Sequence, residues 1–182
     1  MGNLVSLDLG AIVSEGESFG VTIDINFSGY SKDEWLKFNF KIRTSDEEFE
    51  KLIKIGKGQG YILENPSGYE GITDISDDIN QVIYNMCSNL DPDLCNPAQA
   101  YHVVIIESIE LEKKYRKKGF GLETIKLLLT FFKGDLVIIV PCPIRGTCPK
   151  KDEDKVTEKL RKHWMKCGFK QMRDTNTFYS KQ

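Results

Sequence analysis

The sequence has little of what marks a membrane-spanning, secreted or metal-binding protein. No apolar run approaches the roughly 20 residues that a membrane-spanning helix requires. Residues 1–10 lack the basic start and the continuous apolar core of a signal peptide, so we expect a cytoplasmic protein. Only two histidines occur, His102 and His163, and neither stands at ligand spacing from a cysteine pair. We therefore expect neither a metal site nor a membrane partner.

The cysteines do not follow the pattern of a disulfide framework. Their number is odd, their spacing is irregular, and no C-x-x-C pair occurs among Cys87, Cys95, Cys142, Cys148 and Cys167. We expect reduced thiols that mostly fill the core.

The net charge of −2 hides an asymmetry between the two halves of the chain. Residues 1–100 contain 7 lysines and arginines against 17 acidic residues, whereas residues 101–182 contain 18 against 10. A basic half suits a phosphorylated cofactor, and an acidic half could attract a cationic substrate. The alternative is that two solvated surfaces merely differ in sign.

Alternating apolar and polar residues dominate the first half. This pattern predicts antiparallel strands over residues 5–11, 21–27 and 38–42, which would form a three-stranded meander. Ser45 and Glu48 form a capping box that predicts a short helix over Phe49, Leu52 and Ile53. Glycines at 56, 58 and 60 would end that helix. A short strand over 61–63, a helix over 77–86 capped by Ser76, and a loop over 91–99 complete this half.

The second half changes in character. We predict a long strand over 101–111, a helix over 122–132, a buried strand over 135–140, a helix over 155–166 that ends at Gly168, and a terminal hairpin of 169–172 with 178–180. Because 182 residues suit one core better than two, we expect a single domain over residues 1–182.

A glycine-rich basic turn joins the long strand to the next helix. It reads Arg116-Lys117-Lys118-Gly119-Phe120-Gly121. Glycines permit backbone angles and close approaches that a Cβ would block, so successive N–H groups can converge on a phosphate. The following helix adds the positive end of its dipole, and three consecutive cations strengthen the field. The pattern favours an anion-binding site.

The turn and its neighbours resemble the GNAT superfamily of N-acetyltransferases. Leu111 followed by Arg116-x-x-Gly119-x-Gly121 resembles the acyl-CoA signature of that family, and Trp164 to Phe169 resembles its carboxy-terminal G-F element. One strand and one helix separate the two elements, as in the family. A closer similarity, to poorly characterised bacterial and phage GNAT-like proteins, rests on residues 77–79, Pro141-Cys142-Pro143 and Trp164.

The resemblance implies a fold and a cofactor. The fold would be α+β, with a central mixed, mostly antiparallel sheet flanked by helices and with splayed central strands. Residues 101–182 would bind acetyl-CoA, and residues 1–100 would form the variable acceptor side. The backbone of Ile109, Glu110 and Leu111 would hydrogen-bond the pantetheine arm. The pyrophosphate would be held by Arg116, Lys117, Lys118, Gly119, Phe120, Gly121 and Leu122. Alternatively, Lys117 and Lys118 are solvated side chains and only their amides matter.

The implied reaction is acetyl transfer to an amine by direct attack in a ternary complex. The acceptor would be a small-molecule amine or a protein amino group. Glu107 is the best candidate for the base, because it has the side-chain parity of Ile109 and Leu111 on the long strand. Glu110 would face the opposite side, and a bulge would reverse that assignment. Either carboxylate could instead pair with a lysine at a sheet edge.

The position of the usual acid in the family departs from its pattern. Trp164 stands where the family has tyrosine, and an indole N–H is not a useful proton donor. Tyr179 is our candidate for the acid, with Tyr115 as a substitute, although packing would also explain each. An acyl-cysteine on Cys142 is a lesser alternative, since no histidine can be assigned as its partner.

The departure at Trp164 keeps a second hypothesis open. It is a GNAT-fold module that holds acyl-CoA or a protein partner without turnover. We do not expect a nucleic-acid partner, because the total charge is negative and aromatic residues are not interleaved with the basic ones. Whether the chain acts alone or as a homodimer stays open.

Overall fold

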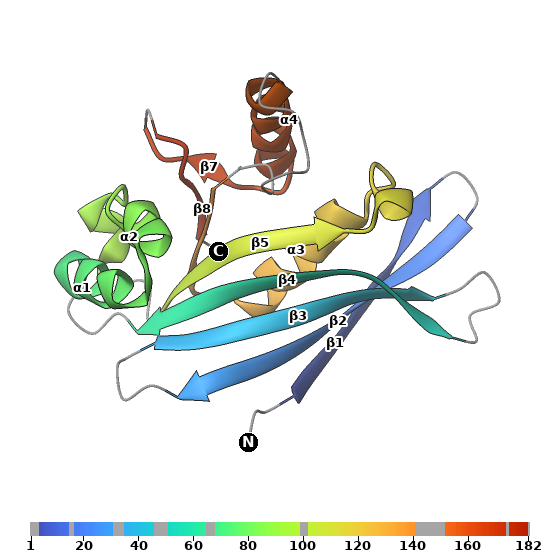
Figure 1. The fold of residues 1–182 in the computed structure, drawn as a ribbon, viewed down its shortest axis with the longest axis horizontal. Helices are drawn as coiled ribbons and strands as arrows, with labels where there is room; N and C mark the ends of the chain where they lie inside the picture. The colour runs from blue at the N-terminus through green and yellow to red at the C-terminus, as the bar shows by residue number, and fades with distance from the viewer. Residues whose placement is uncertain are drawn as a thin grey trace.

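The computed structural model describes residues 4–14, 17–30, 35–45, 51–64, 68–98, 102–140, 152–173 and 175–181. The strands are β1 Leu4–Ser14, β2 Glu17–Tyr30, β3 Trp35–Ser45, β4 Leu52–Glu64, β5 His102–Leu111, β6 Leu136–Ile139, β7 Lys170–Gln171 and β8 Phe178–Lys181 (Figure 1). The α-helices are α1 Tyr69–Ile79, α2 Gln81–Cys87, α3 Phe120–Phe131 and α4 Glu153–Lys166. Two 3-10 turns occur, at Pro92–Cys95 and Lys113–Tyr115.

One open sheet runs through the molecule in the order β1-β2-β3-β4-β5-β6-β8-β7. Neighbouring strands are antiparallel except for the parallel pair β5 and β6, which α3 connects. The prediction of an α+β fold with a mixed, mostly antiparallel sheet is therefore confirmed. None of the helices in the described part of the chain is long and apolar enough to cross a membrane.

Helices α3 and α4 cover one face of the sheet, which we call the α3 face. Alternate strand residues such as Ile23, Phe40 and Ile106 pack there against Leu128 of α3 and Trp164 of α4. In Figure 1, α3 lies behind β4 and β5. The alternation that predicted half-buried strands in the first half thus reflects a real apolar layer on this face.

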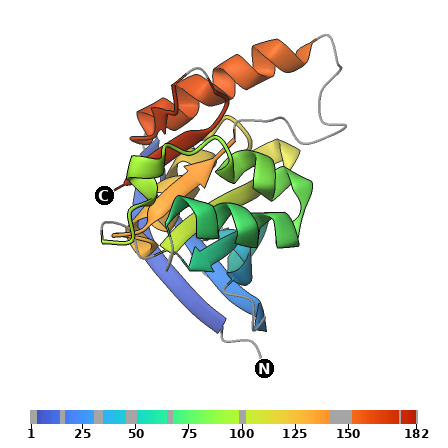
Figure 2. The same cartoon turned by 90° about the vertical axis from the view of Figure 1, so that its left-hand side faces the viewer.

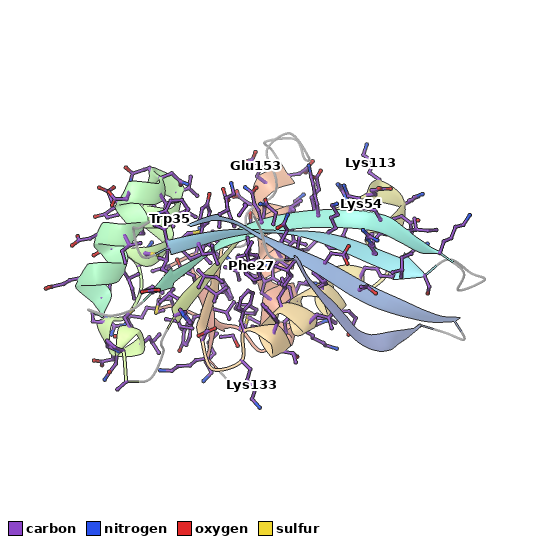
Figure 3. The ribbon with its side chains drawn as sticks, turned by 90° about the horizontal axis from the view of Figure 1, so that it is seen from below. Phe27, Trp35, Lys54, Lys113, Lys133 and Glu153 are labelled. Atoms are coloured by element: carbon purple, nitrogen blue, oxygen red, sulfur yellow. The ribbon has the colours of Figure 1, made fainter. Side chains whose placement is uncertain are left out.

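In the described part of the chain, helices cover the opposite face at one end, where α1 and α2 lie. Tyr61, Leu63, Val103 and Ile105 point into a second apolar cluster with Ile72 of α1. Figure 2, viewed from that end, shows the two helices in front of the sheet. Figure 3 shows Trp35 at the α1–α2 end and Lys54 towards the other end, on the side of the sheet away from Lys133, which follows α3. We call this side the groove face.

The short helix predicted at Leu52 and Ile53 is wrong, because both residues lie in β4; Phe49 lies outside the described residues. The meander therefore has a fourth strand. Glycines 56, 58 and 60 sit inside β4 and do not end a helix. A Cβ at Gly58 would overlap the Phe40 ring, and one at Gly60 would lie 2.5 Å from Phe38 Cζ. Gly58 and Gly60 therefore make room for the two rings. They are glycines because of packing between neighbouring strands, and not because a helix ends there.

The helix predicted over residues 77–86 covers the end of α1 and most of α2, which meet at Asn80, and residues 69–76 of α1 were not predicted as helix. The side chain of Asn80 marks the break. It accepts hydrogen bonds from the Val82 and Ile83 amides at 2.9 and 3.1 Å and caps α2. Ser76 does not act as an N-cap, because it lies inside α1 and its hydroxyl donates to the Thr73 carbonyl. The apolar spacing continues across the break, which explains why the sequence suggested one helix.

The predicted elements of the second half are found within a few residues of their expected ends. Pro141, Cys142 and Pro143 lie outside the described residues. Cys87, Cys95 and Cys167 are buried thiols that form no disulfide. Burial is the main cause that raises the pKa of Cys87 to about 12 and the pKa values of the other two to about 11.

Candidate functional site

A β-bulge interrupts β5 at Glu107. Gln59 of β4 pairs with Ser108 and Gly60 pairs with Ile106, so Glu107 is an extra residue. Ile106 faces the α3 side before the bulge, and Ile109 packs against that same cluster after it. Glu107 therefore does not share a face with Ile109 and Leu111, as regular parity had suggested. The bulge is the physical reason, since it shifts the alternation by one residue.

β5 loses its second strand partner just before this bulge. Its parallel pairing with β6 runs only from Val103 to Ile106, opposite residues 136–139. The stretch from Glu107 to Leu111 pairs with β4 on one side and with no described strand on the other. Apart from the Leu111 carbonyl, which Arg116 uses, backbone groups along this edge have no described strand partner, so an extended ligand could bind there as a strand would. Ile109, Glu110 and Leu111 lie on that edge, as the resemblance requires for a pantetheine arm.

The turn after β5 is held in a specific shape. The Arg116 Nε donates to the Leu111 carbonyl at 2.8 Å, which closes the turn back onto the strand. Lys117 has a φ of 64° and Gly119 a φ of 87°, both in the left-handed region. A non-glycine residue there costs about 1–3 kcal/mol, and such strain concentrates at ligand sites. Arg116 thus positions the turn through its Nε, while Lys117 and Gly119 bend the backbone.

Several backbone amides of this turn have no hydrogen-bond acceptor among the described residues, although the Arg116 amide donates to the Lys113 carbonyl at 3.3 Å. Those of Lys117, Gly119 and Gly121 find no acceptor among the described residues. No described side chain caps the N-terminus of α3. The Leu122 amide, in contrast, donates to the Gly119 carbonyl at 2.9 Å, so Leu122 contributes no amide to a ligand. The open amides and the helix dipole favour an anion, and the exposed Lys117 and Lys118 side chains add positive charge.

Two further residues of the turn have partners in the core. The Phe120 side chain is buried and stands edge-on to Tyr115 with ring centroids 5.9 Å apart. The Tyr115 ring also has Lys114 Nζ 4.8 Å above its centroid. Packing therefore accounts for Tyr115, the substitute candidate for the acid.

Gly121 has no structural need to be glycine. It lies in the first turn of α3, and among the described residues an added Cβ would meet Leu111 Cδ1 at 3.7 Å and His163 Nε2 at 3.9 Å, both ordinary contacts. A glycine that the fold does not require is expected where a ligand approaches the backbone closely. His163 of α4 is thereby placed beside the turn, which the sequence did not reveal. Burial first, and Lys166 second, lower its pKa, so the ring is a neutral neighbour at neutral pH.

The two candidate carboxylates lie on the groove face. Glu107 Oε2 accepts a hydrogen bond from Gln59 Nε2 at 2.7 Å. Glu110 lies 3.6 Å from Lys57 Nζ, and both of these side chains are well exposed. Such an exposed pair contributes little to stability. Glu107 is therefore the carboxylate with a defined position next to the open edge of β5.

The structure does not bring the other catalytic candidate to Glu107. Tyr179 pairs with Ile138 of β6, which pairs in turn with Ile105. Two strand spacings separate Tyr179 from β5, or roughly 10 Å. Its ring packs against the apolar cluster under α1 and α2.

The segment from Trp164 to Phe169 is explained by the way in which α4 ends. α4 ends in a Schellman motif, in which Phe169 N–H donates to the Trp164 carbonyl at 3.2 Å and Gly168 N–H to the Met165 carbonyl at 3.1 Å. Gly168 has the positive φ of 92° that the motif needs. Trp164 is 7% exposed, and its indole Nε1 is buried with no hydrogen-bond partner in the described structure. This buried donor costs free energy unless a ligand uses it.

A polar groove of about 520 Å³ opens on the groove face beside Glu107 and Gln59. It is lined by residues of β2, β3, β4 and β5, among them Lys41, Lys54 and Glu110. The sequence had indicated Glu110 as a site residue and Lys41 as a polar position of an alternating strand, but it gave no role to Lys54. Their convergence depends on strand register, which the alternation does not reveal.

Among the described residues, no cluster of histidine, cysteine or acidic side chains could hold a metal ion. Comparisons of the chain with protein-family models, with curated proteins and with solved structures found no match. The resemblance to the GNAT superfamily therefore rests on the residues and on the arrangement described above.

Proposed function

We propose that the chain is an acyl-CoA-dependent N-acyltransferase that transfers an acetyl group from acetyl-CoA to an amine. The observation that supports this most is the junction of β5 and α3. There an open strand edge, a bulge and a turn with unused amides follow one another within residues 107–121. An extended pantetheine arm fits the edge, and a pyrophosphate fits the turn at the start of α3.

The reaction needs few protein groups. The amine nitrogen attacks the thioester carbonyl, a C–N bond forms, and the C–S bond breaks with its electron pair left on sulfur. Glu107 accepts the proton that the nitrogen loses, directly or through water, and the CoA thiolate takes a proton from solvent. The products are an N-acetyl amine and free CoA. Gln59 orients Glu107 through the 2.7 Å hydrogen bond.

One observation favours the second candidate function, a module that binds acyl-CoA without turnover. Trp164 is buried in the core and its indole cannot supply a proton to the leaving thiolate. Tyr179 packs two strands away from β5. A chain without an acid would still bind the cofactor, since the open edge and the turn do not depend on Trp164 or Tyr179.

The decisive experiment separates binding from turnover. Acetyl-CoA binding is measured by titration calorimetry, and release of free thiol is followed with a panel of amines. Gly121→Asp places a carboxylate beside the unused amides without strain, because the Cβ position is open. Gln81→Asp adds the same charge to the first turn of α2, far from the turn, and serves as the matched control.

We expect the wild type and the Gln81→Asp variant to bind acetyl-CoA and to release thiol, and the Gly121→Asp variant to lose both activities. Binding without thiol release on any amine would favour the binding module. Failure of the wild type to bind acetyl-CoA, or full binding by the Gly121→Asp variant, would refute the proposed cofactor site.

A further inference from the structure

A row of charges crosses four strands at the floor of the polar groove. Asp24, Lys41, Lys57 and Glu110 are successive partners on β2, β3, β4 and β5. Glu110 Oε2 forms an ion pair with Lys57 Nζ at 3.6 Å, and Asp24 Oδ2 forms one with Arg43 Nη2 at 2.8 Å. Lys41 forms no ion pair with any described residue and stands directly opposite Lys57. Like charges in this position destabilise a sheet, and such local conflicts are typical of binding sites.

The next row along the same face is polar and uncharged. It consists of Asn26, Asn39, Gln59 and Ser108, again successive partners across the four strands. Gln59 donates a hydrogen bond to Glu107, whose carboxylate therefore lies beside this row. Two residues along a strand separate the rows, or roughly 7 Å. The groove thus has the Glu107 carboxylate beside the uncharged row, and Lys41 and Lys57 in the charged row.

The groove concentrates positive charge in the acidic half of the chain. Of the seven lysines and arginines among residues 1–100, four line it: Lys41, Arg43, Lys54 and Lys57. Among the described residues, the carboxylates of Asp24 and Glu110 line it with them, and that of Glu107 lies beside it, so the cations still outnumber the carboxylates. Lys54 is exposed and, like Lys41, forms no ion pair with described residues. A ligand with a negative charge would relieve this excess.

We propose that the polar groove binds the acceptor, and that this acceptor is an amine that also carries a carboxylate or phosphate. Lys41 and Lys54 hold the anionic group, while the amine nitrogen lies near Gln59 and Glu107 at the bulge. The inference rests on the proposed acyltransferase function and adds the substrate class to it. The field of the acidic half alone had suggested a purely cationic substrate; the lysines of the groove favour one that carries both signs.

The experiment compares matched amines with and without the anionic group. δ-Aminovalerate is paired with n-pentylamine for the carboxylate arm, and O-phosphoethanolamine with ethanolamine for the phosphate arm. Thiol release gives kcat/KM for each amine with the wild type and with the Lys41→Glu and Lys54→Glu variants. Lys37→Glu is the control, because Lys37 lies on the same strand and face but over the Tyr61 ring, outside the groove. Calorimetry measures binding of the same four amines.

We expect wild-type kcat/KM to favour an anionic amine over its uncharged counterpart, and the arm with the larger ratio identifies the anion. Each groove variant should lose roughly tenfold or more of kcat/KM on the anionic amine only, as the loss of a charge-assisted contact does. The control should change neither value.

The outcomes separate the two proposals. Turnover without preference for an anionic amine, or an equal loss on both amines in the groove variants, overturns the groove inference alone. Binding of an anionic amine that Lys41→Glu abolishes, without turnover on any amine, overturns the acceptor role and the acyltransferase function while leaving an anion site. The absence of both turnover and binding overturns both proposals.

Discussion

Gly121→Ala tests whether the first turn of α3 is shaped by a ligand or by the fold. The added methyl group would meet Leu111 Cδ1 at 3.7 Å and His163 Nε2 at 3.9 Å, which are ordinary contact distances. Replacing glycine by alanine at a compatible helical position stabilises a protein by about 0.4–1 kcal/mol. For a chain of this size, that corresponds to a rise in Tm of roughly 1–4 °C.

The same methyl group would stand where we place the pyrophosphate. Losing one charge-assisted hydrogen bond from a backbone amide costs about 1.5–3 kcal/mol, so the Kd for CoA should rise by roughly tenfold to a hundredfold. Gly119→Ala is the contrasting variant. At a φ of 87° its methyl group strains the backbone, which should lower stability by about 1–2 kcal/mol.

Thermal unfolding and calorimetry with CoA distinguish these effects. A Gly121→Ala variant that is at least as stable as the wild type but binds CoA poorly supports the reasoning. Unchanged CoA affinity in that variant would refute the close approach of a ligand to residue 121. A clear fall in Tm would show that the position has less room than the structure indicates.

Three further predictions concern the fold around the site. Gly58→Ala should destabilise the protein by about 1–3 kcal/mol or more, because the added Cβ overlaps the Phe40 ring and lies 2.5 Å from the Ser108 carbonyl oxygen. Thermal unfolding measures the loss. Gly20→Ala is the control, since no described atom lies within 4 Å of its added Cβ. Asn80→Ala should cost about 1 kcal/mol in urea unfolding, because α2 loses both cap hydrogen bonds, and an unchanged midpoint would contradict that role. The folded state lowers the pKa of His163, so the unfolded chain binds its proton more readily and stability should fall as the pH drops below the ordinary value of about 6.5. His163→Gln should flatten that part of the pH dependence in urea unfolding measured from about pH 7.5 to about pH 5, and an unaltered profile would argue against it.

The order of elements around the candidate site could be read from local patterns. The apolar run before Arg116, the glycine at 119 and the helical spacing after it predicted a strand, a turn and a helix, and the structure has β5, the turn and α3. Gly168 was predicted to end α4, and its φ of 92° confirms this. These features succeed because they depend on backbone angles and on residues within a few positions of one another.

The predictions were less accurate where one sequence pattern can have two physical causes, as for the glycines of β4 and the parity of Glu107. The glycines of β4 suggested a helix end because glycine is common there, yet Gly58 and Gly60 face the rings of Phe40 and Phe38 across the sheet. The parity of Glu107 was wrong because one extra residue in β5 shifts every side chain after it. The alternation of apolar and polar residues within one strand does not reveal a ring that packs from a neighbouring strand, and it does not reveal a bulge.

The sequence by itself determined the alternating strands of the first half and the basic turn at Arg116 to Gly121, since each depends on local periodicity or on the backbone freedom of glycine, whereas the α+β class followed from the resemblance to the GNAT superfamily. Only the tertiary structure decided that β5 leaves β6 at Ile106, that His163 lies beside Gly121, and that Lys41 stands opposite Lys57 in the groove. Strand register and helix packing bring together residues that are far apart in the chain, and the free energy that selects them is spread over the whole core.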